Sequence, residues 1–511
     1  MNISLIQWLQ LFACLSLLVV LHEAGHFGFA KLFKTRVLRF YMFANWGFHL
    51  FSTYDNWFRR LLGKPFVTKR GDEGKNFFAW LINLFYRLTG QADKVKTKNI
   101  GNKEYNPEVG TEYGIGWLPI GGYVAIDGMI DETHQKFSGE PQPWEFRSKK
   151  VWQRFLIMFG GVLMNFLTAW FIYSAIMFTW GRDYIPMRNI TQGFQYSQMA
   201  KNVGFQDGDI PVAVDGKEIA EYSTEVFRTL SNASVVTVLR EGKEMELQMP
   251  SEGLNLLEML QSVPPFLVPI APAVIDSVLP GSAAQKAGFQ KGTRLLTVNG
   301  KEIYSWSDFD YEITLRRRDV LAAPGCTHAD SLAQRRMLVV YQLTDEALPD
   351  TVQLNLDEQY MMGVIRQVPD YKQEHTSYTL LSCIPAGLEE GWRTLTGYVN
   401  DLKYVPTVEG AKSVGSFFSI AGIFPDTWDW LKFWMRTALI SIILAVMNIL
   451  PIPGLDGGHI VILFYEAVTG RQPSEKVLIW LQYIGMGCLM LLMLLAFYND
   501  ISKFVLPMFG F

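Results

Sequence analysis

Cysteine is rare in this chain, with 4 residues in 511, which excludes a disulfide framework as the basis of the fold. Cys14 and Cys488 lie within apolar segments, where cysteine behaves as a small hydrophobic residue. Cys326 and Cys383 fall in the acidic middle of the chain. A bridge between them is compatible with an oxidising compartment, but the sequence does not decide it, and we leave both unpaired.

The chain also lacks an excess of charge of one sign, since 46 Lys and Arg face 49 Asp and Glu. The charges are unevenly placed, because residues 31–154 carry 20 basic and 12 acidic side chains, whereas residues 181–431 carry 21 and 32. A basic block that follows the first apolar segment indicates the cytoplasmic side of a membrane. Nucleic-acid binding needs a denser basic patch, so no nucleic-acid partner is expected.

Long apolar runs, in contrast, are plentiful in a chain that is 49% hydrophobic. Four runs are long enough to cross a bilayer, at about 4–30, 155–180, 430–450 and 477–498. The first run has no small-residue cleavage site, so we expect a retained transmembrane helix and not a removable signal peptide.

Histidine is scarce, yet two of the 7 histidines are four residues apart, in His22-Glu23-Ala24-Gly25-His26. A helix places residues i and i+4 on one face, so His22 and His26 can offer two imidazoles to one zinc ion. Glu23 then lies beside the metal as a general base. Because this motif continues the first apolar run, it predicts a hydrolytic zinc site at the end of a membrane helix.

Catalytic zinc takes three protein ligands and keeps a fourth position for water, so a third ligand is required. Asp456 is the favoured candidate, because it follows the third apolar run and two prolines, Pro451 and Pro453, that break the helix. His459 is the alternative ligand. In this scheme zinc lowers the pKa of a bound water to about 7, and Glu23 takes the proton.

Two amides, Asn165 and Asn448, lie in apolar runs, where buried polar groups are costly and tend to be functional. They could hydrogen-bond the backbone of an unwound substrate or the developing oxyanion. For Asn165 a second interpretation stays open. Gly160 and Gly161 would then form a helix-packing pair, and the amide would be satisfied by a neighbouring helix.

The acidic middle of the chain contains an internal repeat, since Ala200–Ile219 and Ala284–Ile303 share 10 of 20 positions. Each copy predicts a short helix, a Gly turn, a strand and an Asp-Gly or Asn-Gly hairpin turn. This pattern resembles tandem PDZ domains, a family in which a peptide adds as an extra strand beside the binding groove.

Three other segments are less regular. Residues 44–110 could form an insert on the membrane surface, with an interfacial helix from Phe77 to Leu88, or an ordinary soluble loop. Residues 114–124 have the Gly-rich alternation of a strand pair whose exposed edge could hold an extended peptide. Residues 378–424 predict an amphipathic helix followed by a re-entrant turn.

Three motifs together resemble the site-2 intramembrane metalloproteases: His22-Glu23-Ala24-Gly25-His26, Gly161-x-x-x-Asn165 and Asn448-x-x-Pro451-x-Pro453-x-Leu455-Asp456-Gly457. The resemblance extends to residues 111–124 and to the paired repeats, and it leaves residues 44–110 and about 305–375 poorly matched. It implies a polytopic α-helical membrane protein with four transmembrane helices, a membrane-associated β element and two periplasmic PDZ-like α+β domains.

The resemblance also implies a function. Zinc would be the cofactor, held near the cytoplasmic side of a bacterial inner membrane. The implied substrates are membrane-spanning proteins, namely an anti-sigma factor already cut by another protease and leftover signal peptides. The PDZ pair would exclude uncut proteins by size. Gly161 of the second motif, the β element with Gly121 and Gly122, and the stretch Asn448–Pro453 would contact the substrate. Besides these substrates we expect only the lipid bilayer as a partner and a monomeric enzyme.

The expected organisation follows the chain in eight parts. These are 1–43, the first transmembrane helix with the zinc motif; 44–110, the insert; 111–150, the β element; 151–182, the second transmembrane helix; 190–265 and 266–362, the two PDZ-like domains; 376–428, the amphipathic and re-entrant segment; and 429–511, the third and fourth transmembrane helices with the third metal ligand.

Two functions of other classes are weighed against this prediction. An inactive relative could serve as a membrane-anchored binding module, but a pure scaffold has no need for both Glu23 and Asp456. A metal transporter could use the same His and Asp set, but paired PDZ-like domains and a single ligand triad fit that role poorly.

Overall fold

The computed structural model describes residues 3–53, 111–118, 121–129, 140–322, 328–344, 346–358 and 360–502. The chain divides into two units, one formed by Met1–Gly181 with Ser377–Phe511 and the other by Arg182–Thr376. We describe each unit by itself.

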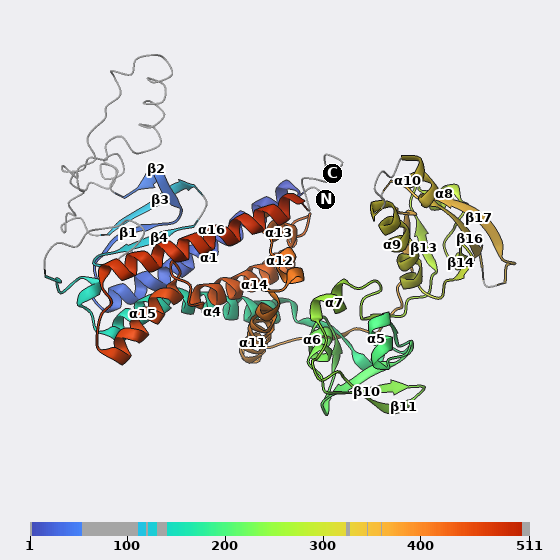
Figure 1. Ribbon diagram of the computed structural model, residues 1–511, viewed down its shortest axis with the longest axis horizontal. Coiled ribbons are helices and arrows are strands. Elements are labelled where there is room, and N and C mark those ends of the chain that lie inside the picture. The colour runs from blue at the N-terminus through green and yellow to red at the C-terminus, as the bar shows by residue number, and fades with distance from the viewer. Residues whose placement is uncertain are drawn as a thin grey trace, which may run out of the picture. The chain divides into compact units, whose positions relative to one another are not determined.

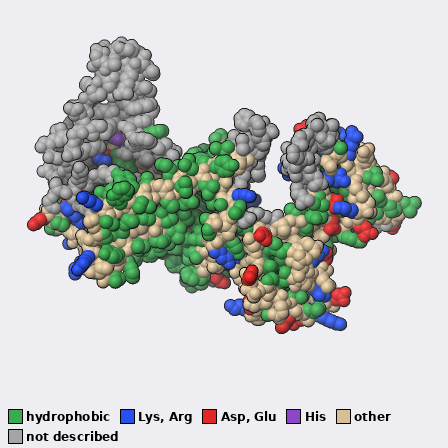
Figure 2. Space-filling view, viewed as in Figure 1, with side chains coloured by type: hydrophobic (Ala, Val, Ile, Leu, Met, Phe, Trp, Pro, Cys, Tyr) green, Lys and Arg blue, Asp and Glu red, His purple; other side chains and the backbone are tan. Residues whose placement is uncertain are grey.

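Four helices of the first unit are long and apolar enough to cross a membrane. They are α1 (Leu5–Leu32), α4 (Val151–Trp180), α14 (Trp430–Ile449) and α16 (Glu475–Asp500) (Figure 1). Figure 2 shows hydrophobic side chains covering the surface of this helical part. These four candidate spans fit the predicted polytopic membrane protein.

Helix α4 is the centre of the first unit, because α1, α11 (Cys383–Asp401), α14 and α15 (Asp456–Thr469) all pack against it. Helices α1 and α4 approach closely where two glycines meet, since a Cβ on Gly160 would lie 2.7 Å from the Gly25 carbonyl oxygen. Glycine pairs permit this close approach of two helix backbones. The contact sets α4 directly against the turn of α1 that carries the zinc motif.

A four-stranded sheet accompanies these helices, with the strand order β2-β3-β1-β4. Its strands are β1 (Val37–Tyr41), β2 (Ala44–Ser52), β3 (Glu112–Leu118) and β4 (Tyr123–Ile126). The sequence placed the β element at 111–150, whereas the structure adds residues 37–52 to it. The reason is a buried polar contact, in which Tyr41 and Ser52 both donate hydrogen bonds to the Glu112 carboxylate. The helix expected from Phe77 to Leu88 lies outside the described residues.

The segment before α14 is mostly helical. Helix α11 packs on α4 with Gly387 against Ser174, and it leaves Ile384, Leu388 and Trp392 exposed. The segment also contains a 3₁₀ turn (Leu402–Tyr404), α12 (Val408–Ser413) and α13 (Phe417–Gly422). Cys383 is buried with a free thiol, and Cys326 lies outside the described residues.

The second unit contains two four-stranded antiparallel sheets with equivalent strand orders, β11-β10-β7-β8 and β17-β16-β14-β15. Each contains one copy of the sequence repeat. Both predicted hairpin turns are present, since Asp215 and Asn299 have φ values of 47° and 50° and each is followed by a glycine with positive φ. The strands are β7 (Ile210–Val214), β8 (Lys217–Glu218), β10 (Val235–Arg240), β11 (Lys243–Gln248), β14 (Arg294–Val298), β15 (Lys301–Glu302), β16 (Arg336–Gln342) and β17 (Asp350–Asn355).

Shorter elements complete the second unit. The helices are α5 (Gln198–Val203), α6 (Glu225–Ser231), α7 (Leu256–Gln261), α8 (Ala283–Lys286), α9 (Trp306–Ala322) and α10 (His328–Arg335). The remaining strands are β5 (Arg182–Pro186), β6 (Phe194–Tyr196), β9 (Glu221–Tyr222), β12 (Leu267–Pro269), β13 (Ile275–Val278), β18 (Val364–Arg366) and β19 (Glu374–Thr376).

Candidate metal centre

Three side chains from distant parts of the chain meet at one point of the first unit. His22 Nε2 lies 3.2 Å from His26 Nε2, and Asp456 Oδ2 lies 3.2 Å from His22 Nε2 and 3.3 Å from His26 Nε2. Zinc bonds of 2.0 to 2.1 Å in a tetrahedral site imply ligand atoms about 3.3 to 3.4 Å apart. The separations of the three donor atoms therefore suit a zinc ion.

The surroundings of Asp456 Oδ2 also fit a cation. This oxygen is buried and accepts no hydrogen bond within the described part of the chain. A buried carboxylate oxygen without a donor is costly, and a metal ion would remove that cost. Asp456 is also the first residue of α15, where the helix dipole favours a negative charge.

Two glycines after Asp456 allow α15 to begin beside the end of α14. A Cβ on Gly457 would meet the carbonyl oxygens of Ile449 and Leu450, and one on Gly458 would lie 2.7 Å from the Ile452 carbonyl oxygen. The chain between the two helices contains Pro451 and Pro453, which cannot continue α14. This compact connection is what brings the carboxylate to the histidine pair.

The two imidazoles lie against the backbone of α4 at Gly161. A Cβ at this position would lie 2.6 Å from His22 Cε1 and 2.7 Å from His22 Nε2, and closer still to His26 Nε2. Only glycine leaves room for both rings. Gly161, which the sequence predicted to contact the substrate, therefore lies directly against the two predicted ligand rings.

The Nδ1 atom of each histidine faces α4. His26 Nδ1 lies 2.8 Å from the Ile157 carbonyl oxygen, and His22 Nδ1 lies 3.2 Å from the Asn165 side-chain amide. A proton on His26 Nδ1 leaves Nε2 with its lone pair facing Asp456. The sequence analysis missed Ile157, because every residue has a backbone carbonyl and the residue type does not show which one is used. The sequence feature that could have indicated it is the four-residue spacing of Ile157, Gly161 and Asn165 along one helix face.

Glu23 lies next to this cluster and outside the group of three donors. Its carboxylate is close enough to interact electrostatically with His22, His26 and Asp456, and it accepts a hydrogen bond from the Val124 backbone N–H. Val124 belongs to β4, which pairs with β1 alone among the described strands. An edge strand therefore lies beside the predicted general base.

The glycines of the β element lie at the start of β4. Gly121 has a φ of 69°, a left-handed conformation that favours glycine. A Cβ on Gly122 would lie 2.7 Å from the Tyr41 carbonyl oxygen and 3.0 Å from Val19 Cγ1 of α1. Gly122 thus lets the sheet approach α1 one turn before the zinc motif. Asn448 lies in the last turn of α14 and is half-buried.

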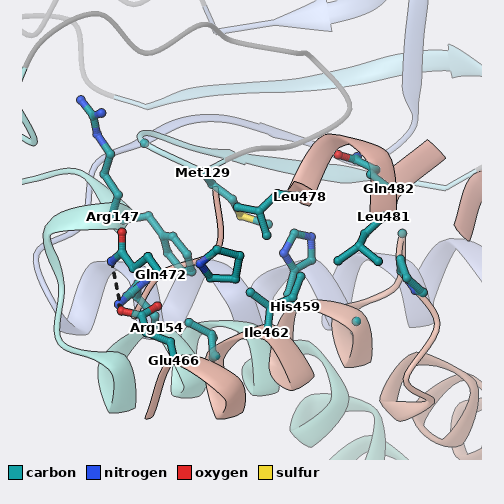
Figure 3. A pocket seen from close by; sticks show the side chains of 17 residues that line it. Met129, Arg147, Arg154, His459, Ile462, Glu466, Gln472, Leu478, Leu481 and Gln482 are labelled. Atoms are coloured by element: carbon teal, nitrogen blue, oxygen red, sulfur yellow. Dashed lines mark hydrogen bonds and ion pairs between the residues drawn. The ribbon is translucent and has the colours of Figure 1, made fainter. Parts of the chain in front are cut away.

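His459, the alternative third ligand, lines a different space. A cavity of about 160 Å³ opens between α15, α16 and the residues before α4, and the His459 ring contributes to its wall together with Met129, Leu478 and Leu481 (Figure 3). The group of potential metal ligands found among the described residues contains Asp456 and not His459. The geometry therefore favours Asp456.

One wall of this cavity holds an ion pair that the sequence analysis missed. Arg154 Nη2 of α4 donates to Glu466 Oε1 of α15 at 2.5 Å, and both side chains are buried (Figure 3). The sequence signal was a lone glutamate in an apolar helix, which requires a partner. The pair joins α4 to the helix that begins with Asp456.

Comparison with known proteins gives the family. Residues 89–492 match the model of peptidase family M50. The chain is 27% identical over 422 residues to the regulator of sigma-E protease RseP of Escherichia coli K12, which covers 78% of this chain and 88% of that protein. The corresponding protein of Salmonella typhimurium strain 14028s is 28% identical over 424 residues, with 77% and 88% covered.

A Neisseria meningitidis protein whose name describes a zinc metalloprotease is 26% identical over 522 residues, which covers 95% of this chain and 97% of that protein. The matched range contains the motifs Gly161-x-x-x-Asn165 and Asn448–Gly457 and the paired repeats. The chain therefore belongs to peptidase family M50, and the predicted resemblance to the RseP-like site-2 proteases is confirmed.

Proposed function

We propose that this protein is a zinc-dependent intramembrane protease that hydrolyses peptide bonds within the transmembrane segments of single-span proteins. The observation that carries the proposal is the triangle of His22, His26 and Asp456 donor atoms, 3.2 to 3.3 Å apart. The two histidines lie on α1, a helix long enough to cross a membrane. A soluble protease would hold such a site in an aqueous cleft, whereas here the substrate is itself a membrane helix.

The chain's own residues supply the acid–base chemistry and the positioning. Zinc, when bound, acts as a Lewis acid on a water molecule and on the peptide carbonyl. Glu23 is placed to take the proton of the attacking water and to pass it to the leaving amine. The Val124 backbone N–H holds the Glu23 carboxylate in place beside the ligands.

The substrate must be extended before its peptide bonds are reached, because a helix buries its amides in internal hydrogen bonds. The edge of β4 that faces away from β1, which pairs with no other described strand, can add an extended segment beside Glu23. We propose that Gly121 and Gly122 just before β4, Asn448 in the last turn of α14, and Pro451 and Pro453 between α14 and α15 contact that segment. The half-buried Asn448 amide has hydrogen-bonding groups suited to a peptide backbone.

From the names of the relatives we infer where this protein acts and on which substrates. It would act in a bacterial inner membrane as a monomer, on an anti-sigma factor and on signal-peptide remnants. The zinc site would lie near the cytoplasmic side, in keeping with the excess of basic residues in 31–154, and the acidic second unit would lie in the periplasm.

Metal removal tests the proposed function. The purified full chain in lipid nanodiscs should contain one zinc ion and cleave a single-span substrate, and a chelator should abolish cleavage until zinc is restored. Asp456→Ala should lower zinc content in the same preparation, because it removes one of three ligands. His459→Ala is the matched control one turn later and should retain zinc. Cleavage by fully metal-free protein would refute the proposal.

We propose that the repeat-containing part of the second unit forms two PDZ-like domains that exclude substrates with bulky periplasmic parts. The proposal is supported by the equivalent strand orders of the two sheets. Deletion of residues 190–360 should let the enzyme cut a substrate that still carries its periplasmic domain, at a rate near that of the trimmed substrate. The measurement is the ratio of the two cleavage rates, and a ratio equal to that of the intact chain would contradict the size-filter role.

A further inference from the structure

We propose that Asn165 is a positioning residue that fixes the tautomer of His22 and thereby sets the affinity of the metal centre. This inference rests on the proposed zinc site. It differs from the substrate-contact role suggested by the sequence, because the Asn165 side chain is fully buried, at 0% exposure, and is not open to a substrate.

The first step of the argument is the contact between the amide and the ring. The Asn165 side-chain amide lies 3.2 Å from His22 Nδ1. The other terminal atom of the amide, at the Oδ1 position, has no hydrogen-bond partner within the described residues. Among the described residues, His22 is therefore the one polar partner of the Asn165 side-chain amide.

The second step is the direction of this hydrogen bond. The oxygen and nitrogen of an amide have nearly the same shape, so the ring decides which of them faces Nδ1. If the NH₂ group faced Nδ1, the His22 proton would lie on Nε2 and point at His26 and Asp456. If the carbonyl oxygen faces Nδ1, it accepts the Nδ1 proton and leaves the Nε2 lone pair free for a cation. Zinc binding requires the second arrangement.

The third step is the equivalent contact of the other ligand. His26 Nδ1 lies 2.8 Å from the Ile157 carbonyl oxygen, which can only accept a hydrogen bond. Ile157 and Asn165 are two helical turns apart on the face of α4 that carries Gly161 between them. One helix face therefore orients both rings, with a backbone oxygen for His26 and a side-chain oxygen for His22.

The fourth step is the support of Asn165 itself. Ser441 Oγ of α14 donates a 2.8 Å hydrogen bond to the Asn165 backbone oxygen. This contact ties the turn of α4 at Asn165 to α14, so the amide approaches His22 from a fixed backbone. In other metalloproteins, carboxylate and carbonyl oxygens orient metal-bound histidines by the same kind of hydrogen bond.

The test measures zinc affinity and not cleavage. Three variants of the full chain in nanodiscs are titrated against a competing chromophoric chelator. Asn165→Leu removes the acceptor at similar volume and should weaken zinc binding by about 10- to 100-fold. Asn165→Asp keeps an acceptor toward His22 and should bind zinc at least as tightly as the wild type. Thr168→Val, at a buried position one turn further along α4, is the control and should match the wild type.

A spectroscopic measurement on the wild type makes the test independent of how the variants fold. In zinc-loaded protein with ¹⁵N-labelled histidine, His22 should show a protonated Nδ1 and a metal-bound Nε2. Metal binding through His22 Nδ1, or equal zinc affinity of wild type and Asn165→Leu, overturns this inference alone. Absence of zinc binding by the wild type overturns the proposed function together with it.

Discussion

Glu23→Gln is expected to lower the cleavage rate of a single-span substrate by about 10²- to 10⁴-fold, the usual contribution of a general base, while zinc stays bound. Glutamine has the shape of glutamate and can still accept the Val124 hydrogen bond, but it cannot take a proton from water. The three donor atoms do not include the Glu23 carboxylate, so metal content should not change.

The measurement pairs a zinc determination with a single-turnover cleavage assay on the same nanodisc preparation. Near-normal turnover by Glu23→Gln would remove Glu23 from the mechanism. Because the variant keeps its metal and substrate contacts, it should also retain substrates that the wild type releases. Mass spectrometry of proteins bound to it in native membranes would then identify the physiological substrate.

Gly161→Ala is expected to have the second largest effect, a loss of zinc affinity of about 100-fold or more with a parallel loss of cleavage. The added Cβ would lie within 3 Å of both imidazoles, a distance that real Cβ atoms essentially never show. The rings would have to leave the face of α4, and with it their contacts to Ile157 and Asn165. Chelator competition measures the loss.

The matched control for Gly161→Ala is Gly28→Ala. Gly28 is also a helical glycine of the first unit, on α1, and a Cβ there would meet no atom within 4 Å. Gly28→Ala should bind zinc like the wild type and be slightly more stable, since alanine favours a helix over glycine by up to about 1 kcal/mol. Unchanged zinc affinity in Gly161→Ala would show that the imidazoles do not lie against this helix face.

Much of the candidate site could be predicted because its signals are local. The spacing of His22 and His26 follows from the pitch of a helix, and the four apolar runs follow from the thickness of a bilayer. The hairpin turns at Asp215 and Asn299 follow from the backbone preferences of Asp-Gly and Asn-Gly. None of these features depends on which other segments lie nearby.

Other features depend on contacts between distant segments and were misjudged or missed. Residues 44–52 read as the start of an insert, yet they pair with β3 because Ser52 and Tyr41 share the buried Glu112 carboxylate. Arg154 and Glu466 are 312 residues apart, and neither residue type alone indicates the other as its partner. The start of the insert and the residues that form the cavity wall could therefore be identified only from the packed structure.

The sequence by itself determined that this is a membrane protein with a zinc-protease motif at the end of its first transmembrane helix, because helix pitch and apolar length are properties of the local chain. Only the tertiary structure separated Asp456 from His459 in space, although the two lie one turn apart on the same helix. It placed the Asp456 carboxylate beside the histidine pair and the His459 ring in the separate cavity. The physical reason is that the glycine contacts of α1 with α4 and of α14 with α15 set the distances between residues some 430 positions apart.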